Sequence, residues 1–405
     1  MNKPSVIEGT GFINYAWPEY ALRVVAERYS DDGFAELSFY SANKGSDSLL
    51  HQTRVNLLAT TTMNQLVKRM EKNSDKTPWT DILTYITGKT LEIARRGEVT
   101  LDIWPSDKAG LAPSYLLEPV LYKNHPSVVF GDYGSAKSLM ALVMAYIVQL
   151  PYQDNKLGLI PEGDSNKVLY LDYEDDADSF TRRWSSISRG FGHEAAMPVK
   201  YRRMTATLYD SVEPLRAEII DKSIGLIIVD SLGPAARGNL NDPEPAIKYH
   251  AALRQLNVTS LTLAHTSKDQ LTRSRTIFGS VFFTNLARSV WECKAEQEVG
   301  EDDVVISLKQ TKANLSKLHL PMGYRIIFGD KITVNKTDLK DTALSGDLPL
   351  SWRIRNILNR GPATIAKLTE DMGDSSLDTV GRTLRRMRSK NQVIKLENDL
   401  WGNAQ

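Results

Sequence analysis

The sequence predicts an α/β protein with a mainly parallel central sheet, and two observations lead to this fold class. First, between residues 121 and 340, short apolar runs rich in β-branched residues alternate with segments of helical periodicity. This alternation is typical of a parallel sheet covered by helices on both faces. Second, the segment VVFGDYGSAKS (128–138) places a glycine-containing turn between an apolar run and a helical pattern, as a phosphate-binding loop requires.

The composition restricts the class of protein. The chain has 405 residues, 41% of them hydrophobic and 24% charged, with a net charge of +1. Any basic surface must therefore be local. The single cysteine, Cys293, excludes an internal disulfide and a zinc site built on paired cysteines. We find neither a signal-peptide pattern nor an apolar stretch of membrane-spanning length, and we expect a cytoplasmic protein with no membrane partner.

The sequence divides into four parts. Residues 1–97 alternate apolar and polar residues around a turn and then show helical periodicity, which predicts a small α+β domain for docking or oligomerisation. Residues 98–120 contain three prolines and are predicted as a linker. Residues 121–340 form the α/β core, and residues 350–405 form a second compact unit.

Within the core, four apolar runs are predicted as buried parallel strands. Each ends in polar residues, as expected at the sheet edge where ligands bind. The runs that follow these four have no long helices between them, which predicts an antiparallel extension of the sheet. The parallel runs are PSVVFG, KVLYLDYE, GLIIVDS and LTLAH, and the antiparallel runs are VVISLKQT and YRIIFG with KITVNK.

The turn after PSVVFG has the composition of an ATP-binding loop. Backbone amides at the start of the following helix would face the phosphates, while an ammonium would pair with the β and γ oxygens. Alanine at position 136 replaces the second glycine of the usual pattern and is expected to fit only with a negative φ. The predicted nucleotide-binding residues are Gly131, Asp132, Tyr133, Gly134, Ser135, Ala136, Lys137 and Ser138.

Polar residues at the other strand ends are candidates for the metal and for catalysis. Asp230 ends an apolar strand and, with the Ser138 hydroxyl, would hold Mg²⁺. Glu174 follows another strand and could activate water, with Asp172 as the alternative. His265 ends a third strand, where it could sense the γ-phosphate. The competing interpretation is that these groups only cap turns or strand ends.

Two basic segments are candidates for contact with DNA. The polar stretch 266–280 carries Lys268, Arg273 and Arg275 and could track the backbone of a single strand, or could be an ordinary surface loop. Residues 350–405 read as three helices and a hairpin with a two-residue turn, the order of a winged helix-turn-helix. With ten Lys/Arg and six Asp/Glu, this segment has a net charge of +4.

The third of these helical patterns carries most of the charge. Its residues Arg382, Arg385 and Arg386 share one face by their three- and four-residue spacing. They are expected to meet duplex phosphates. A winged helix that binds protein remains the alternative.

GDYGSAKS, LDYEDD, LIIVDS and LAHTSKD, in this order, resemble the RecA-like ATPases of the plasmid RepA hexameric helicase type and the DnaB-like helicases. The resemblance covers about residues 115–330. It implies a homo-oligomer, expected to be a hexamer, that hydrolyses ATP with Mg²⁺ between subunits and passes single-stranded DNA through its ring. It also implies Glu174 as the base and His265 as the linking sensor.

A cation from the neighbouring subunit is part of the same resemblance. Lys312, with Asn314, fits the K-x-[NR] element of such families best, and Lys309 is the alternative. Arg288 is a second candidate. Each could instead be an exposed cation of an edge strand or helix.

The sequence thus favours a nucleic-acid-dependent ATPase motor, a RepA-like helicase of a phage or mobile element. Two alternatives stay open. One is a recombination mediator or loader ATPase of the same class that does not unwind DNA. The other is a DNA-binding regulator that ATP switches between states.

Overall fold

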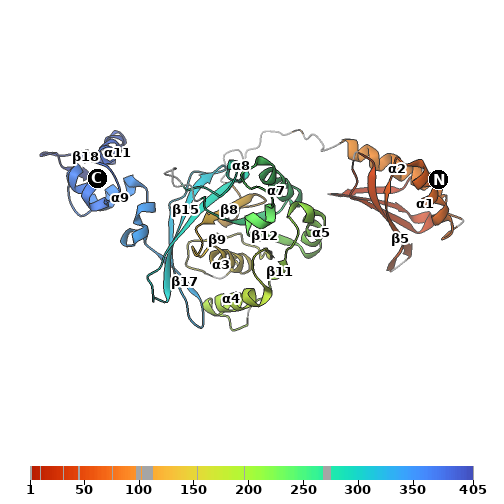
Figure 1. The fold of residues 1–405 in the computed structure, drawn as a ribbon, viewed down its shortest axis with the longest axis horizontal. Coiled ribbons are helices and arrows are strands. Elements are labelled where there is room, and N and C mark those ends of the chain that lie inside the picture. Colours follow the sequence, from red (N-terminus) through yellow and green to blue (C-terminus); the bar gives the residue numbers. More distant parts are fainter. Residues whose placement is uncertain are drawn as a thin grey trace. The chain divides into compact units, whose positions relative to one another are not determined.

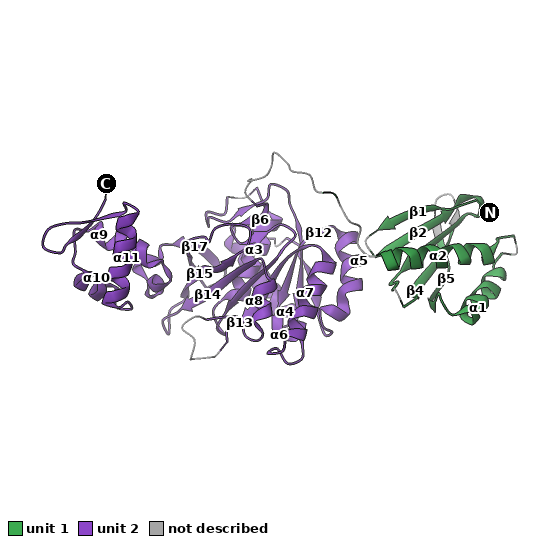
Figure 2. Cartoon of the chain, turned by 90° about the horizontal axis from the view of Figure 1, so that it is seen from above, with its two compact units in different colours: residues 1–109 green, residues 110–405 purple. Residues whose placement is uncertain are grey.

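The computed structural model describes residues 2–9, 11–30, 32–43, 46–74, 76–96, 102, 113–152, 154–195, 197–267 and 275–404. The chain divides into two compact units, residues 1–109 and residues 110–405 (Figure 2).

The first unit is an antiparallel sheet with two helices on one face. Neighbouring strands pair in sequence order. Alternate residues of β2 are buried because they face the helices, and Tyr15 and Trp17 are among the largest fully buried side chains. The apolar residues of α2, such as Ile82 and Ile86, complete this core. The elements are β1 (Ser5–Gly9), β2 (Phe12–Trp17), β3 (Leu22–Glu27), β4 (Phe34–Asn43), β5 (Ser46–Asn56), α1 (Thr60–Glu71) and α2 (Trp79–Arg96).

The second unit contains a nine-stranded sheet in the order β11-β10-β12-β13-β8-β14-β15-β16-β17. The first six strands in this order are parallel, and the last three add antiparallel pairs at one edge. This confirms the predicted fold class. The strands are β8 (Pro126–Gly131), β10 (Lys167–Asp172), β11 (Lys200–Arg203), β12 (Ile224–Asp230), β13 (Thr259–His265), β14 (Ser289–Glu296), β15 (Asp303–Ala313), β16 (Met322–Ile327) and β17 (Thr333–Thr337).

Helices cover both faces of this sheet (Figure 1). Helix α3 (Lys137–Gln149) is buried along almost its whole length, which explains its unbroken apolar sequence. Together with α4 (Ala177–Gly190) it packs on one face. The other face is covered by α5 (Val212–Lys222) and α7 (Pro243–Leu256). Two short helices are α6 (Leu232–Ala236), which follows β12, and α8 (Val281–Leu286), which precedes β14.

A small three-stranded sheet precedes and flanks the core. It consists of β6 (Tyr115–Glu118), β7 (Leu121–Tyr122) and β9 (Ile160–Pro161). Strand β6 falls inside the segment predicted as a linker, because that segment ends in apolar residues that become buried. Most of the linker, residues 98–101 and 103–112, lies outside the described residues.

Residues 350–404 contain three helices and a two-stranded hairpin with an apolar core of their own. The elements are α9 (Leu350–Leu358), α10 (Ile365–Met372), α11 (Leu377–Ser389), β18 (Val393–Lys395) and β19 (Trp401–Asn403). The predicted two-residue turn is wrong. Leu396 N donates to Leu400 O at 2.8 Å, which leaves three residues at the tip. Two of them, Asn398 and Asp399, have φ of 54° and 57°, a conformation that Asn and Asp adopt more readily than other side chains.

Among the described residues, no helix combines the length and the apolar character needed to cross a membrane.

Candidate functional site

The phosphate-loop sequence forms a turn between β8 and α3, as predicted. Ala136 precedes α3 with φ 58° and ψ 21°, so the expectation of a negative φ is wrong. The turn must reverse the chain into the helix, and this fixes the left-handed conformation at the position where related loops carry glycine. A left-handed non-glycine residue costs about 1–2 kcal/mol, which the surrounding packing of the turn must offset.

Lys137 extends into the loop that it terminates. Its ammonium donates to Asp132 O at 2.7 Å, to Gly131 O at 3.1 Å and to Ser135 Oγ at 3.2 Å. The side chain is buried, and burial lowers the pKa of Lys137. The only positive charge on the loop is therefore held at its centre, beside the first amides of α3, where a phosphate would meet both.

Ser138 and Asp230 lie next to each other at the start of α3 and the end of β12. The Ser138 hydroxyl hydrogen-bonds to Asp230, and Tyr170 donates its hydroxyl proton to Asp230 Oδ2 at 2.5 Å. Burial raises the pKa of Asp230. A hydroxyl and a carboxylate side by side offer the hard oxygen ligands that Mg²⁺ prefers, so these two residues fit the predicted metal site.

Glu174 follows β10 and His265 ends β13, the two strands on either side of β12, and their side chains face each other. Glu174 Oε1 lies 3.8 Å from His265 Nε2, and both side chains are about half exposed, at 48% and 47%. Ser231 donates a hydrogen bond to the same oxygen of Glu174. The pair is thus oriented by the protein and still open to a water molecule, as a general base and its partner must be.

Asp172, the alternative base, has a different role. Its side chain is only 2% exposed, and its Oδ1 accepts hydrogen bonds from the backbone amides of Glu174 and Asp175, both at 2.9 Å. These bonds fix the turn that presents Glu174. Geometry therefore favours Glu174 over Asp172 as the residue that meets water.

One cavity of about 480 Å³ joins these groups. Lys137, Glu174, Asp230 and His265, which are predicted to converge from four strand ends, all line it. The sequence analysis misses several other residues of its wall. Ser231 and Arg183 add polar groups, while the apolar end comes from the antiparallel strands and their turns. The wall residues missed from the sequence include Arg183, Ser231, Gln297, Val304, Phe328 and Ile332.

Only some of these residues could have been found from the sequence. Ser231 follows Asp230 directly, so its proximity to the strand end is a usable signal. Arg183 lies eight residues after Asp175 and forms an ion pair with it, a contact that helical spacing alone does not reveal. Phe328 and Ile332 reach the cavity only through the pairing of β16 and β17.

One protein family and one solved structure are similar to parts of this chain. Residues 98–271 match the AAA_25 family, described as an AAA domain. A KaiC-like protein from the hyperthermophilic archaeon Pyrococcus horikoshii OT3 is a similar solved structure, with 14% sequence identity and a TM-score of 0.39. The similarity covers 56% of this chain and 96% of that protein. A search of curated proteins finds no match to the chain.

The match to an AAA domain and the converging strand ends together support a P-loop ATPase core. The match covers less than half of the chain, and it ends before β14 to β17 and before residues 350–404.

A hairpin leaves the nucleotide cavity of the ATPase core at His265. Phe278 N donates to His265 O at 2.8 Å, Ser267 N donates to Thr276 O at 2.9 Å, and Thr266 forms a bridge with Ile277. The strand that carries the candidate sensor is therefore paired with the returning chain. Residues 268–274 lie outside the described residues, and with them the DNA-contact candidates Lys268 and Arg273.

Both strands of the hairpin bind one carboxylate of the phosphate loop. Thr266 Oγ1 donates to Asp132 Oδ1 at 2.9 Å, and Arg275 forms an ion pair with Asp132 Oδ2 at 2.5 Å. Burial alone would raise the pKa of Asp132, but the Thr266 hydroxyl and the Arg275 charge hold it below its usual value. Arg275, predicted to contact DNA, thus also contacts the nucleotide loop.

The candidate trans-acting cations Arg288 and Lys312 lie at the opposite end of the strands from the phosphate loop. Arg288 is exposed, and its amide donates to Pro126 O, at the start of β8, at 2.9 Å. Lys312 Nζ donates to the backbone oxygens of Thr284, Asn285 and Ala287 at 2.9, 2.7 and 2.7 Å.

Lys312 therefore neutralises the carbonyl end of α8 in its own chain. A role in trans would require it to leave these three bonds. Lys309, the alternative, is part of an ion-pair cluster with Asp347 at 3.8 Å. Of the three cations, Arg288 alone presents an exposed side chain at this edge.

The basic residues of the third C-terminal helix lie on α11. Arg382, Arg385 and Arg386 are exposed, and Arg382 forms an ion pair with Asp378 one turn earlier at 2.5 Å. Arg385 also lines a cavity with Arg388 and Lys395 from the hairpin side. The predicted basic face therefore exists, and DNA binding by it stays a prediction.

Proposed function

We propose that the protein is a nucleic-acid-dependent ATPase motor that couples ATP hydrolysis to movement along single-stranded DNA, in the manner of a RepA-like helicase of a phage or mobile element. The hairpin that starts at His265 carries the proposal. Its base contacts Glu174 in the nucleotide cavity and Asp132 in the phosphate loop. DNA bound by Lys268, Arg273 and Arg275 would therefore be linked to the chemistry of ATP.

In the proposed hydrolysis, each residue acts on ATP through a specific atom. The Lys137 ammonium exchanges loop carbonyls for β- and γ-phosphate oxygens. Ser138 and Asp230 hold Mg²⁺, which when bound neutralises charge on the phosphates. Glu174 accepts the proton of the attacking water through a carboxylate oxygen, held in place by Ser231. His265 would report the presence or the loss of the γ-phosphate to the hairpin.

The proposed active form is a homo-oligomer, expected to be a hexamer. ATP would bind between subunits, because Arg288 lies at the far end of the strands from its own phosphate loop and could reach only a neighbour's nucleotide. A cation that approaches in trans would stabilise charge in the transition state. The exposed face of α11 would bind duplex DNA beside the ring.

The test measures ATP hydrolysis with and without single-stranded DNA, followed by strand displacement on forked duplexes of both polarities. We expect stimulated hydrolysis and displacement on one polarity. Stimulation without displacement would favour the mediator or loader ATPase. Nucleotide binding with negligible turnover, together with sequence-specific duplex binding by residues 350–404, would favour the switched regulator.

Two variants connect the activity to the site. Lys137→Ala should lose binding of a fluorescent ATP analogue, because the charge on the phosphate loop is removed. Glu174→Gln should keep this binding and lose hydrolysis by about 10²–10⁴-fold, the usual contribution of a positioned general base. Unchanged turnover in Glu174→Gln would assign the base elsewhere.

A further inference from the structure

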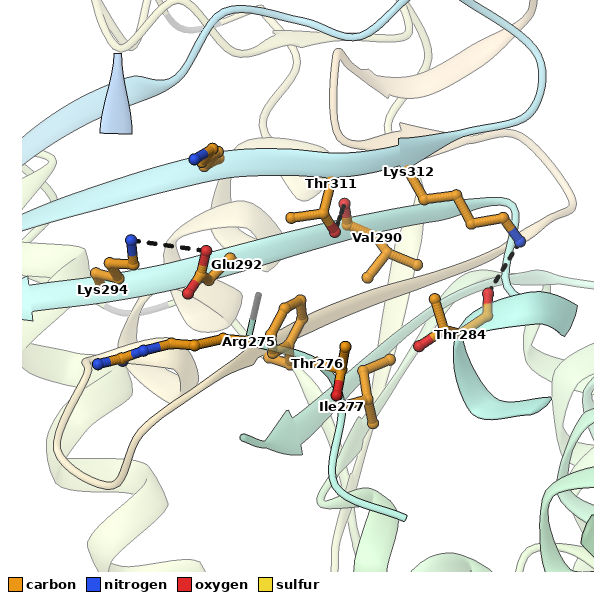
Figure 3. A pocket seen from close by; sticks show the side chains of 11 residues that line it. Arg275, Thr276, Ile277, Thr284, Val290, Glu292, Lys294, Thr311 and Lys312 are labelled. Carbon is orange, nitrogen blue, oxygen red and sulfur yellow. Dashed lines mark hydrogen bonds and ion pairs between the residues drawn. The ribbon is translucent and has the colours of Figure 1, made fainter. Parts of the chain in front are cut away.

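A second cavity lies beside the base of the hairpin (Figure 3). Its wall residues Phe130, Ile277 and Val290 belong to the core on the face of the sheet opposite α3. Its volume is about 440 Å³, within the range of small-molecule sites. Its walls come from the hairpin base 275–277, from β14 and from β15. None of its residues lines the nucleotide cavity.

Glu292 is the feature of this cavity that calls for a ligand. The residue is only 6% exposed, and burial raises the pKa of its carboxyl group. One oxygen, Oε2, lies 3.7 Å from Lys294 Nζ, while Oε1 has no hydrogen-bond partner within the described part of the chain. A buried acceptor without a partner is costly, so a hydrogen-bond donor belongs at this position.

Cations surround this acceptor. Lys309 is the cross-strand neighbour of Glu292, and its nearest carboxylate, on Asp347, is 3.8 Å away. Arg275 enters from the hairpin with five N–H donors, of which the ion pair with Asp132 uses only part. Counting Arg275, Lys294, Lys309 and Lys312 against Glu292, Asp347 and Asp132 leaves a net charge of +1. The cavity therefore suits a ligand that carries an anionic group and a neutral donor, and disfavours a cationic side chain of a partner.

The remaining walls fit the rest of a nucleotide. Val290, Ile277 and Phe130 form an apolar side, and Thr276 and Thr311 contribute hydroxyl groups. Phe130 is buried to 1% exposure and offers no free ring for stacking. A base would thus be recognised at its edge, by hydrogen bonds.

We propose that this cavity binds one nucleotide unit with an exocyclic amine, as in cytosine or adenine, with its phosphate at Lys309 and Arg275 and its amine at Glu292. The inference builds on the proposed function, because the position beside the hairpin points to a unit of the single strand as the source. A free nucleoside monophosphate has the same chemistry and is the second source. Thymine lacks the amine and would bind less tightly.

The test uses fluorescence anisotropy of the full-length protein with labelled (dC)12 and (dT)12 at fixed salt. We expect (dC)12 to bind about 5-fold more tightly, the effect of one hydrogen bond. Glu292→Met should remove this preference because it removes the acceptor. Glu292→Gln should retain it because the amide oxygen still accepts. Equal affinities in the wild type, or a preference that survives Glu292→Met, would overturn the inference.

The phosphate contact has its own variant and control. Lys309→Met should weaken both oligonucleotides alike and lower the slope of log affinity against log salt by about 1. The exposed Lys317, which lies outside the cavity, serves as the control, and Lys317→Met should leave both unchanged. A Lys309→Met variant that binds like Lys317→Met would count against the phosphate position.

Two further measurements assign the source and separate this inference from the proposed function. Competition by free dCMP that depends on Glu292 would identify the monophosphate as the ligand. If no DNA strand stimulates ATP hydrolysis, the proposed motor function is wrong. Glu292-dependent binding of dCMP would still show whether the cavity binds a nucleotide. If strands stimulate hydrolysis equally in wild type and Glu292→Met, with no base preference, the cavity inference fails alone. Loss of oligomer mass in Glu292→Met without any change in strand binding would also overturn it, in favour of a subunit contact.

Discussion

Replacing Lys312 by methionine should loosen α8 in its own subunit. The ammonium accounts for three hydrogen bonds to the last carbonyls of α8 and the residue after it. Methionine keeps most of the apolar stem and removes only the charge and the donors. Ala287, whose oxygen is one of the three acceptors, is fully buried, so water cannot readily replace the lysine there.

The expected cost is about 2–3 kcal/mol. A hydrogen bond to a charged group contributes about 1.5–3 kcal/mol, and a cation at a helix C-terminus adds about 0.3–1 kcal/mol. The three bonds share one charge, and the other two acceptors lie nearer to solvent, so their contributions do not add in full. Burial and the nearby Arg288 charge lower the pKa of Lys312, which offsets part of the gain.

Hydrogen–deuterium exchange followed by mass spectrometry measures this locally. Each 1.4 kcal/mol corresponds to a factor of ten in an equilibrium constant. Amides of α8 that exchange by local opening, at a free energy below that of global unfolding, should therefore exchange about 30–150-fold faster. Lys309→Met is the matched control on the same strand, since its ion pair with Asp347 spans 3.8 Å. It should change exchange in α8 by less than a factor of three, because the ion pair of Lys309 is with Asp347 and not with a residue of α8.

Exchange in α8 that is unchanged in Lys312→Met would refute the reasoning. If strand-stimulated ATP hydrolysis fell at the same time, Lys312 would be the trans-acting cation expected from the sequence. A complementation test, in which Lys312→Met and Lys137→Ala subunits are mixed, would then restore activity.

Three further outcomes are expected. Burial raises the pKa of Asp230, so its proton stabilises the folded form at low pH, and this contribution is lost as pH rises through the raised pKa. Asp230→Asn should therefore raise the melting temperature more at pH 8 than at pH 4. An equal gain at both pH values would contradict the raised pKa. Ala136→Gly relieves about 1–2 kcal/mol of left-handed strain against about 0.4–1 kcal/mol of chain entropy, so urea unfolding should show a gain of about 0–1.6 kcal/mol, and a clear loss would disprove the strain. Leu384→Ala should destabilise residues 350–404 by about 2–5 kcal/mol and abolish duplex binding in a gel-shift assay, while strand-independent ATP hydrolysis stays unchanged.

Much of the ATPase core could be predicted from its strands. Each apolar run ends in the polar group that the sheet then places in the cavity, and parallel pairing aligns these ends. For example, Asp172 pairs with Asp230, and His265 pairs with Gly131. Local sequence is sufficient to place these groups, because parallel strands are buried on both faces and their carboxyl ends meet at the one edge of the sheet where ligands bind.

The contacts that sequence could not supply are those between distant segments. Lys312 binds carbonyls about 25 residues earlier in the chain, and backbone acceptors leave no trace in side-chain patterns. Arg275 reaches Asp132 only because β13 lies beside β8. The φ of Ala136 follows from how the turn must enter α3, which overrides the preference of alanine itself.

Gly131 is constrained both by the phosphate loop and by the neighbouring strand β14. A Cβ at this position would lie 2.1 Å from the carbonyl oxygen of Cys293 on the adjacent strand β14. The bare α-carbon is thus demanded by the strand beside the loop, whatever occupies the loop itself. Loss of ATP hydrolysis in Gly131→Ala would therefore indicate that β8 and β14 have been pushed apart. It would not show that Gly131 contacts ATP.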